Sequence, residues 1–372
     1  MTPRRTRAAG AGLALAAALG LAAARPAAAQ RPARLAEAAD VLARLVETYG
    51  VSGHEAPVRD AILHLLPAWA SPTVDSAGNV VVRAGTGAPL VVFVAHMDEI
   101  GFVVTAIRDD GSLELRPAGG FFPSLFEAEP ALVHTARGPV PAVFMPRDSA
   151  GGAPRHLPGA LRVDPGTTTR AATEALGIRP GDGVTMPKAF ARLAGSRATG
   201  RSMDDRVGCT AQLLALRGLD PRRLRHEVVF VFSVREEIGL EGARAAAAEL
   251  APGRPARVHA IDTFVSSDAP LEIRTFADAP LGAGAVVRAI DNSSVTPPAL
   301  VDSVLALARA RHIPLAAGTT NGGNDGSMFT AYGVPDVGLG WPLRYAHSPA
   351  EVVDLADVVA LADVVQAIAE GW

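Results

Sequence analysis

The stretch Leu90-Val91-Val92-Phe93-Val94-Ala95-His96-Met97-Asp98-Glu99-Ile100 decides how the fold of this chain is predicted. Its apolar first half predicts a strand buried on both faces, as in a parallel sheet. The strand ends at His96, and Asp98 follows two residues later. A rigid strand end of this kind can hold a metal-ligating histidine together with the carboxylate that orients it. A single histidine is weak evidence, so the prediction depends on the rest of the chain.

Two further apolar runs end in acidic residues. Residues 227–234 lead into Arg235-Glu236-Glu237, and residues 257–261 are stopped by Asp262. Adjacent acids at the end of a buried strand are costly unless a positive charge pairs with them. We therefore expect these side chains to face a cation or a site that holds one.

Helical periodicity alternates with these strands along the chain. Helices are expected over residues 34–48, after Ser52, from Met203, over 300–310 and over 355–368. Alternating strands and helices predict an α/β fold with a mostly parallel sheet flanked by helices. In such sheets the ligand site lies beyond the carboxyl ends of the strands.

The predicted strand ends supply a set of metal ligands. His96, Glu236, Glu237 and Asp262 all fall at that edge of the sheet. Together with Asp204 at a helix start and His347 near the C-terminus, they form the kind of His/Asp/Glu set that holds two divalent metals.

Residues 101–187 differ from the rest of the chain in the pattern of their apolar, Gly and Pro residues. Short apolar runs alternate with Gly and Pro, and helical spacing is confined to residues 169–176. A stretch this long and apolar is not a loop, so we predict a small β-rich insert. His134, His156 and Asp164 in this insert have no spacing that indicates a ligand role.

Composition restricts the classes of function. The chain has 372 residues, 49% apolar and 20% charged, with a formal net charge of -3, which suits more than one domain with a large core. Its arginines are scattered, so no nucleic-acid footprint is present. Cys209 is the single cysteine, which excludes an internal disulfide and a cysteine-based zinc cluster.

The N-terminus has the pattern of a secretory signal peptide over residues 1–29. Arg4, Arg5 and Arg7 precede an apolar Ala/Leu/Gly run that ends in Ala27-Ala28-Ala29. Cleavage after Ala29 predicts a periplasmic or secreted protein with no membrane association after cleavage. An uncleaved N-terminal anchor is the alternative.

With these motifs in this order, the mature chain resembles the co-catalytic metallo-aminopeptidases, the family that includes glutamyl, deblocking and tetrahedral aminopeptidases. The similar segments are Ser52-Gly53-His54-Glu55, Asp75 to Asn79, Ala95 to Gly101, Asp204-Asp205-Arg206-Val207-Gly208, Glu236-Glu237-Ile238-Gly239, Ile261-Asp262 and Arg344-Tyr345-Ala346-His347-Ser348-Pro349.

The resemblance implies a zinc-peptidase α/β domain formed by residues 30–100 and 188–372. It also implies that residues 101–187 form an inserted, β-barrel-like dimerisation domain and that the protein is a homo-oligomer. Family members act on peptide substrates with two divalent metal ions per subunit. Zinc is the expected metal, with cobalt or manganese as alternatives.

The resemblance also implies a role for each site residue. Asp204 would bridge the two metals, His96 and Asp262 would complete one site, and Glu237 and His347 the other. Glu236 would be the general base, and Asp98 would orient His96.

This sequence departs from the family pattern in three places. Arg235 stands where the family usually has Gln, which predicts a more positive neighbourhood and a lower pKa for Glu236. Gly323-Asn324-Asp325 replaces the usual Gly-Thr-Asp of the substrate-side loop. The signal peptide is the third departure, because the familiar members are mostly intracellular.

The resulting functional hypothesis is an exported metallo-aminopeptidase that removes N-terminal residues from peptides. A related di-metal carboxypeptidase or amidohydrolase on the same scaffold is the alternative enzyme. A glycosidase using Glu236 and Glu237 is a different class, which adjacent strand residues facing opposite sides would serve poorly. A binding protein with a dead site is the third class, but every ligand and base position is present.

Overall fold

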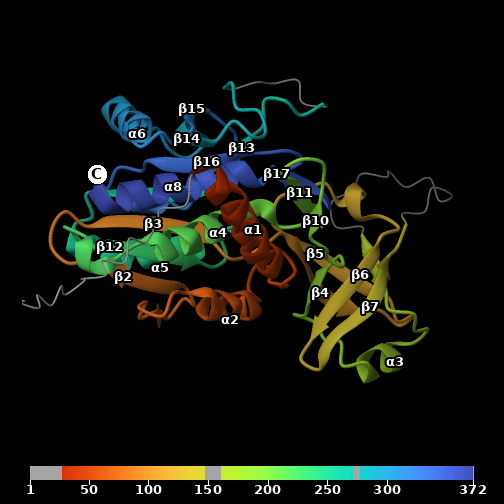
Figure 1. The fold of residues 1–372 in the computed structure, drawn as a ribbon. Helices are drawn as coiled ribbons and strands as arrows, with labels where there is room; N and C mark the ends of the chain where they lie inside the picture. Colours follow the sequence, from red (N-terminus) through yellow and green to blue (C-terminus); the bar gives the residue numbers. More distant parts are fainter. Residues whose placement is uncertain (1–26, 147–160, 271–276, 372) are drawn as a thin grey trace, which may run out of the picture.

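The computed structural model describes residues 27–146, 161–270 and 277–371. It has two parts, a large sheet with helices on both faces and a closed barrel beside it (Figure 1). The helices are α1 (Ala27–Val46), α2 (Ala56–Leu65), α3 (Arg170–Ala175), α4 (Met203–Gly218), α5 (Glu241–Leu250), α6 (Pro298–Ala310), α7 (Ser327–Thr330) and α8 (Leu355–Gly371), with short 3-10 turns η1 (Pro123–Phe126), η2 (Pro221–Arg223) and η3 (Ala251–Gly253).

The large sheet is made of eight strands in the order β1-β2-β12-β3-β13-β16-β14-β15. These strands are β1 (Thr73–Val74), β2 (Val80–Ala84), β3 (Val91–His96), β12 (Val228–Ser233), β13 (Arg257–Val265), β14 (Ala285–Ile290), β15 (Leu315–Thr319) and β16 (Gly338–Leu343). The four central strands, β12, β3, β13 and β16, are parallel, whereas β2 and β14 join them antiparallel. The predicted α/β fold is confirmed, with a sheet that is mixed towards its margins.

The central strand β3 is buried on both faces, as its apolar sequence predicts. Val91, Phe93 and Ala95 pack into the core beneath helices α1, α2, α4 and α8, whereas Val92 and Val94 pack on the opposite face with residues of α5 and α7. Alternation along a strand sends successive side chains to opposite faces. Both faces must therefore be apolar, which explains the unbroken run.

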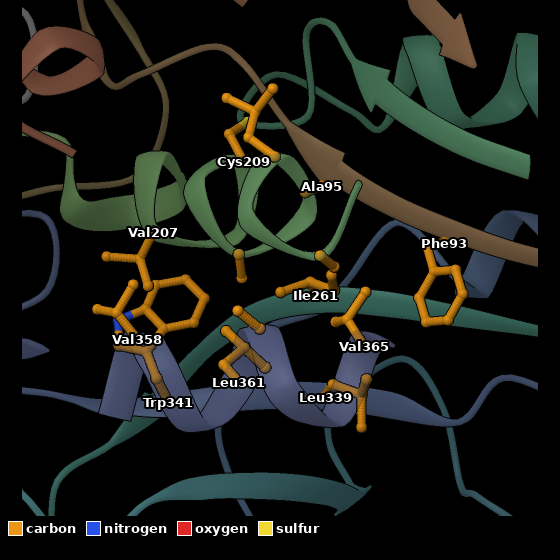
Figure 2. Close-up of a cluster of buried hydrophobic side chains, with 14 of the residues drawn as sticks. Phe93, Ala95, Val207, Cys209, Ile261, Leu339, Trp341, Val358, Leu361 and Val365 are labelled. Atoms are coloured by element: carbon orange, nitrogen blue, oxygen red, sulfur yellow. The ribbon is translucent and has the colours of Figure 1, made fainter. Parts of the chain in front are cut away.

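The larger core lies between the sheet and helices α4 and α8 (Figure 2). Trp341 from β16 is its largest fully buried side chain. The figure labels side chains from three sheet strands and both helices: Phe93, Ala95, Val207, Cys209, Ile261, Leu339, Trp341, Val358, Leu361 and Val365. This packing holds the helix that follows Asp204 rigidly against the sheet.

The predicted barrel-like insert is present as a closed barrel with the strand order β4-β5-β8-β7-β6-β9. Phe102 lies at the centre of its core, and the rings of Phe121, Phe126 and Phe144 are 5.0 to 5.3 Å away. The strands are β4 (Gly101–Ile107), β5 (Leu113–Ala118), β6 (Pro130–Thr135), β7 (Gly138–Phe144), β8 (Arg162–Asp164) and β9 (Gly183–Thr185). A separate three-stranded sheet contains β10 (Ala191–Arg192), β11 (Arg197–Gly200) and β17 (Glu351–Asp354).

A buried carboxylate joins the two parts where the chain crosses between them. Glu99 precedes β4, and Lys188, which follows β9, has its Nζ 2.5 Å from Glu99 Oε1. Arg201 and Arg206 lie 3.4 and 3.7 Å from the same carboxylate, and Ser202 donates a hydrogen bond to it. Burial alone would raise the pKa of Glu99, but the three cations lower it to about 2. Glu99 therefore stays charged and ties both chain crossings together.

Two local predictions about strand and helix ends are wrong. Asp262 does not end its strand, because β13 continues to Val265. The helix expected from Met203 is interrupted at once, since Asp204 and Asp205 have non-helical backbone angles and the peptide bond between them is cis. The regular helix begins after these two acids, which leaves their side chains free to face the sheet edge.

Most of the predicted signal peptide, and His156 of the insert, lie outside the described residues. Among the helices that the structure describes, none combines the length and apolar character needed to cross a membrane.

Candidate active site

His96 lies at the end of β3 and is buried among acidic side chains. Its Nε2 is 3.1 Å from Asp204 Oδ1, and its Nδ1 is 3.5 Å from Asp98 Oδ1. Its backbone N–H donates to Asp205 Oδ2 over 3.0 Å. Burial acts to lower the pKa of His96, but Asp204 and Asp98 outweigh it and raise the pKa well above the ordinary value. Asp98 thus has the placement expected of a residue that orients His96.

The two carboxylate oxygens of Asp204 face two different histidines. Oδ1 lies 3.1 Å from His96 Nε2, and Oδ2 lies 3.2 Å from His347 Nε2. Although burial opposes it, these two histidines hold the pKa of Asp204 well below its usual range. A carboxylate held between two potential ligand nitrogens is placed to serve two cations.

Glu237 and His347 form the second side of the site. Glu237 Oε1 is 3.4 Å from His347 Nε2, and this buried oxygen accepts no hydrogen bond. His347 Nδ1 is 2.5 Å from the backbone carbonyl oxygen of Gly120. Because a carbonyl oxygen can only accept a hydrogen bond, we assign the proton to Nδ1, which leaves Nε2 available as a ligand. A buried oxygen without a hydrogen-bond donor fits the role of a ligand to a cation.

Asp262 is held from behind by a buried arginine. Arg288 Nη1 lies 3.1 Å from Asp262 Oδ1, and Nη2 lies 3.1 Å from Asp291 Oδ2. The backbone N–H of Thr263 also donates to Asp262 Oδ1 over 2.5 Å. These contacts fix the carboxylate near His96.

The ligand atoms of these residues form three groups, each within 4.8 Å. The groups are His96/Asp204/Asp262, Asp204/Glu237/His347 and His96/Glu236/Glu237. The first two share Asp204, which is the arrangement that the resemblance implied. Carboxylate oxygens and imidazole nitrogens are suitable ligands for zinc, and the unsatisfied Glu237 oxygen also fits an ion at this place.

Glu236 and Glu237 do not face opposite sides, contrary to expectation. Strand β12 ends at Ser233, and the residues after it form a turn rather than a continued strand. Both backbone N–H groups donate to Asp98, over 3.0 and 3.2 Å. Glu236 Oε2 lies 4.0 Å from His96 Nε2, so both carboxylates reach the same side as the histidines.

The expected effect of Arg235 on Glu236 is also wrong. Its Nε donates to Glu241 Oε2 over 2.6 Å and its Nη2 donates to the carbonyl of Ala77 over 3.3 Å. Burial and the neighbouring carboxylates raise the pKa of Glu236 well above its ordinary value, against the opposing charge of His96. A high pKa suits a group that must accept and return a proton.

Two residues that support the site, Glu351 and Arg288, are not predicted from the sequence, and a third, Asp325, is predicted only as part of the substrate-side loop. Glu351 accepts the backbone N–H of His347 over 2.8 Å and that of Met203 over 2.7 Å, so it joins the two loops that carry His347 and Asp204. Arg288 orients Asp262, and Asp325 accepts a hydrogen bond from Ser233 at the end of β12. Arg288 and Glu351 are lone charges without a pattern around them. Glu351 lies four residues from His347 but 148 residues from Met203.

The site opens into a cavity of about 770 Å³. Residues from both the sheet and the barrel line it: His96, Gly120, Phe121, Phe122, Leu125, Asp204, Glu236, Glu237, Leu240, Asp262, Thr263, Val265, Arg288, Thr320, Asn321, Gly322, Gly323, Ala346 and His347.

Comparison with known proteins gives consistent matches. Residues 78–364 match the model of the M42 glutamyl aminopeptidase family. The chain is 28% identical over 355 residues to glutamyl aminopeptidase of Lactococcus lactis, covering 89% of this chain and 96% of that protein. It is 29% identical over 337 residues to lysyl aminopeptidase of Pyrococcus furiosus, covering 86% and 93%.

A solved structure is similar over nearly the same extent. The TET1 peptidase of Pyrococcus horikoshii, described as able to assemble into a tetrahedron or a large octahedral shell, superposes with a TM-score of 0.82. Its sequence is 31% identical, and the match covers 90% of this chain and all of that one.

Proposed function

Because this chain belongs to the M42 glutamyl aminopeptidase family and is an aminopeptidase, we propose that it uses two divalent metal ions to cleave N-terminal residues from peptides. We also propose that it acts in the periplasm or outside the cell. The position of Asp204 between His96 and His347 is the observation that carries the two-metal proposal. One ion would be held by His96, Asp204 and Asp262. The other would be held by Asp204, Glu237 and His347.

Two such ions, when bound, polarise the scissile carbonyl and lower the pKa of water. Zinc is the metal we propose, with cobalt or manganese as alternatives. Hydrolysis joins the oxygen of water to the carbonyl carbon, breaks the C–N bond and places a proton on the leaving nitrogen. Glu236 lies in the cavity beside the ligands and would accept the water proton and pass it to the leaving amine.

Asp98 supports this chemistry without lining the cavity. It accepts the backbone N–H groups of Glu236 and Glu237, and its Oδ1 lies 3.5 Å from His96. One buried carboxylate therefore sets the positions of the proposed base and of a ligand on each metal. Ser52 donates to the same carboxylate over 2.6 Å and fixes it in turn.

A substrate screen on metal-free protein tests this function. We expect no hydrolysis after chelation, and recovery when zinc, cobalt or manganese is added back to aminoacyl substrates. Peptides with N-acetylated ends should remain intact, because an aminopeptidase requires the free amine. A related carboxypeptidase would release the C-terminal residue of the blocked peptides, so this product would favour the alternative enzyme. Full activity in metal-free protein would contradict the two-metal proposal.

Export is supported by the basic and apolar N-terminal sequence that ends in Ala27-Ala28-Ala29. We expect the protein from its native host to begin at Gln30 or within a few residues of it. N-terminal sequencing of protein from the periplasmic or culture fraction makes the measurement. A chain that begins at Met1 or Thr2 would show that the segment is not removed.

The similar TET1 peptidase forms large shells, which supports a homo-oligomer here. We propose that the inserted barrel provides contacts between subunits. Light scattering on the whole chain, and on variants with charges introduced on the barrel surface, would show whether the assembly depends on it.

A further inference from the structure

The cavity at the proposed metal ligands is lined by charged residues and by uncharged residues, and we call the uncharged part of the lining its walls. Its charged residues are His96, Asp204, Glu236, Glu237, Asp262, Arg288 and His347. Among the described residues that line the cavity, the others are apolar, glycine or neutral polar. The side chain of a substrate's first residue must lie in this cavity, since the bond that is cut is adjacent to it.

Arg288 is the one arginine in the described lining, and both of its Nη atoms are engaged, whereas its buried Nε has no hydrogen-bond partner. Its side chain is 1% exposed and pairs with Asp262 and Asp291, each at 3.1 Å. It also donates to the backbone carbonyls of Thr263 and Gly323 over 2.8 and 2.9 Å. Because the whole guanidinium is buried, Nε included, an acidic substrate side chain would have to displace these partners to reach it, so Arg288 provides no subsite for one.

The lining acids are committed in the same way. Asp204, Glu237 and Asp262 belong to the proposed ligand groups, and Glu236 is the proposed base. A basic substrate side chain that paired with one of them would compete with the metals. The described cavity thus offers no spare carboxylate to a lysine or arginine.

The walls instead present apolar surface. Phe122 and Leu125, from the barrel, are 76% and 44% exposed, and Leu240 and Val265 come from the sheet part. Phe121 beside them is anchored, since its ring packs on Phe102 and Phe126 at 5.0 Å. Covering exposed apolar surface with an apolar substrate side chain is favourable, whereas desolvating a charge against it is costly.

We propose that this enzyme is selective for peptides whose first residue is uncharged and apolar, such as leucine or phenylalanine, and discriminates against acidic and basic first residues. This inference rests on the proposed function and specifies its substrate class. The walls formed by Phe122, Leu125, Leu240 and Val265 would receive the side chain.

Steady-state kinetics of the metal-loaded full-length enzyme test the selectivity. The substrates are the 4-nitroanilides of leucine, phenylalanine, glutamate and lysine. We expect kcat/KM for leucine and phenylalanine to be at least about tenfold higher than for glutamate and lysine. Equal or higher values for glutamate or lysine would overturn the selectivity and leave the aminopeptidase function intact. Cleavage of none of the four with any metal would overturn both.

A pair of substitutions places the subsite. Leu125 lines the cavity, whereas Val143, also on the barrel and similarly exposed at 48%, does not line it. Leu125→Lys should raise the ratio of kcat/KM for glutamate to that for leucine by about tenfold, because it introduces an unpaired ammonium into the wall. Val143→Lys should leave this ratio unchanged. The same ratio in Leu125→Lys, Val143→Lys and the wild type would contradict the proposed wall.

Discussion

Glu236→Gln is expected to lower kcat by roughly 10²- to 10⁴-fold with little change in KM. The amide keeps the shape of the side chain but cannot accept the proton of the attacking water. Metal binding should persist, because Glu236 belongs to neither of the two groups that share Asp204. The backbone N–H of residue 236 would still donate to Asp98, so the turn should remain in place. Kinetics and elemental analysis of the same preparation measure both effects.

Glu237→Gln is the matched control, because both acids occupy the same turn and lie on the same side of the site. The Gln at 237 removes an anionic ligand, so it should weaken one metal site, and raising the metal concentration should partly restore activity. Activity lost in Glu236→Gln should not return with added metal. A Glu236→Gln enzyme that retained near-normal turnover, or recovered it in excess zinc, would place the base elsewhere.

Asp204→Asn is expected to have the largest effect on metal content, with loss of both ions and loss of activity by more than about 10²-fold. The substitution removes the charge from the residue whose oxygens lie between His96 and His347. Zinc should also stop stabilising the fold. A site occupied at 100 times its Kd adds about 2.7 kcal/mol to the free energy of unfolding.

Asp262→Asn provides the comparison for this variant, since it affects only the group that contains His96. We expect elemental analysis to find about one ion fewer per chain in Asp262→Asn, and almost none in Asp204→Asn. Thermal unfolding with and without zinc gives a second measurement. An Asp204→Asn protein that kept both ions would show that this residue does not bridge them.

The sequence predicts the fold well for those elements in which every residue of the segment is buried. The run around Phe93 must be apolar on both faces, so its pattern identifies a central strand. Turn residues and short apolar runs likewise predict the β-rich insert, whereas its barrel-like form was implied by the family resemblance. These signals are local, and they survive in any tertiary context that buries the segment.

The site was predicted less completely because it depends on where each strand stops. Glu236 and Glu237 were assigned opposite faces, but β12 ends at Ser233, and a turn sends both to one side. Arg288 pairs with Asp262, and Glu351 joins His347, four residues away, to Met203 far along the chain, so no periodicity marks either residue. Asn324, at which this sequence departs from the Gly-Thr-Asp pattern of the family, has a structural role. Its Nδ2 donates to Asp291 Oδ2 over 2.5 Å, and its buried side chain does not line the cavity.

The ion cluster around Glu99 also has a consequence for how the enzyme can change. All of the proposed ligands and the base belong to the sheet part, whereas Phe122 and Leu125 belong to the barrel. Both chain crossings meet at Glu99 and Lys188, and the carbonyl of Gly120, which belongs to the barrel, contacts Nδ1 of the proposed ligand His347, so a tilt of the barrel would shift the rim of the cavity and this ligand together. Entry of the peptide and its cleavage are therefore inherited together: a substitution at Glu99 is expected to alter both which peptides enter and how well the metals are held.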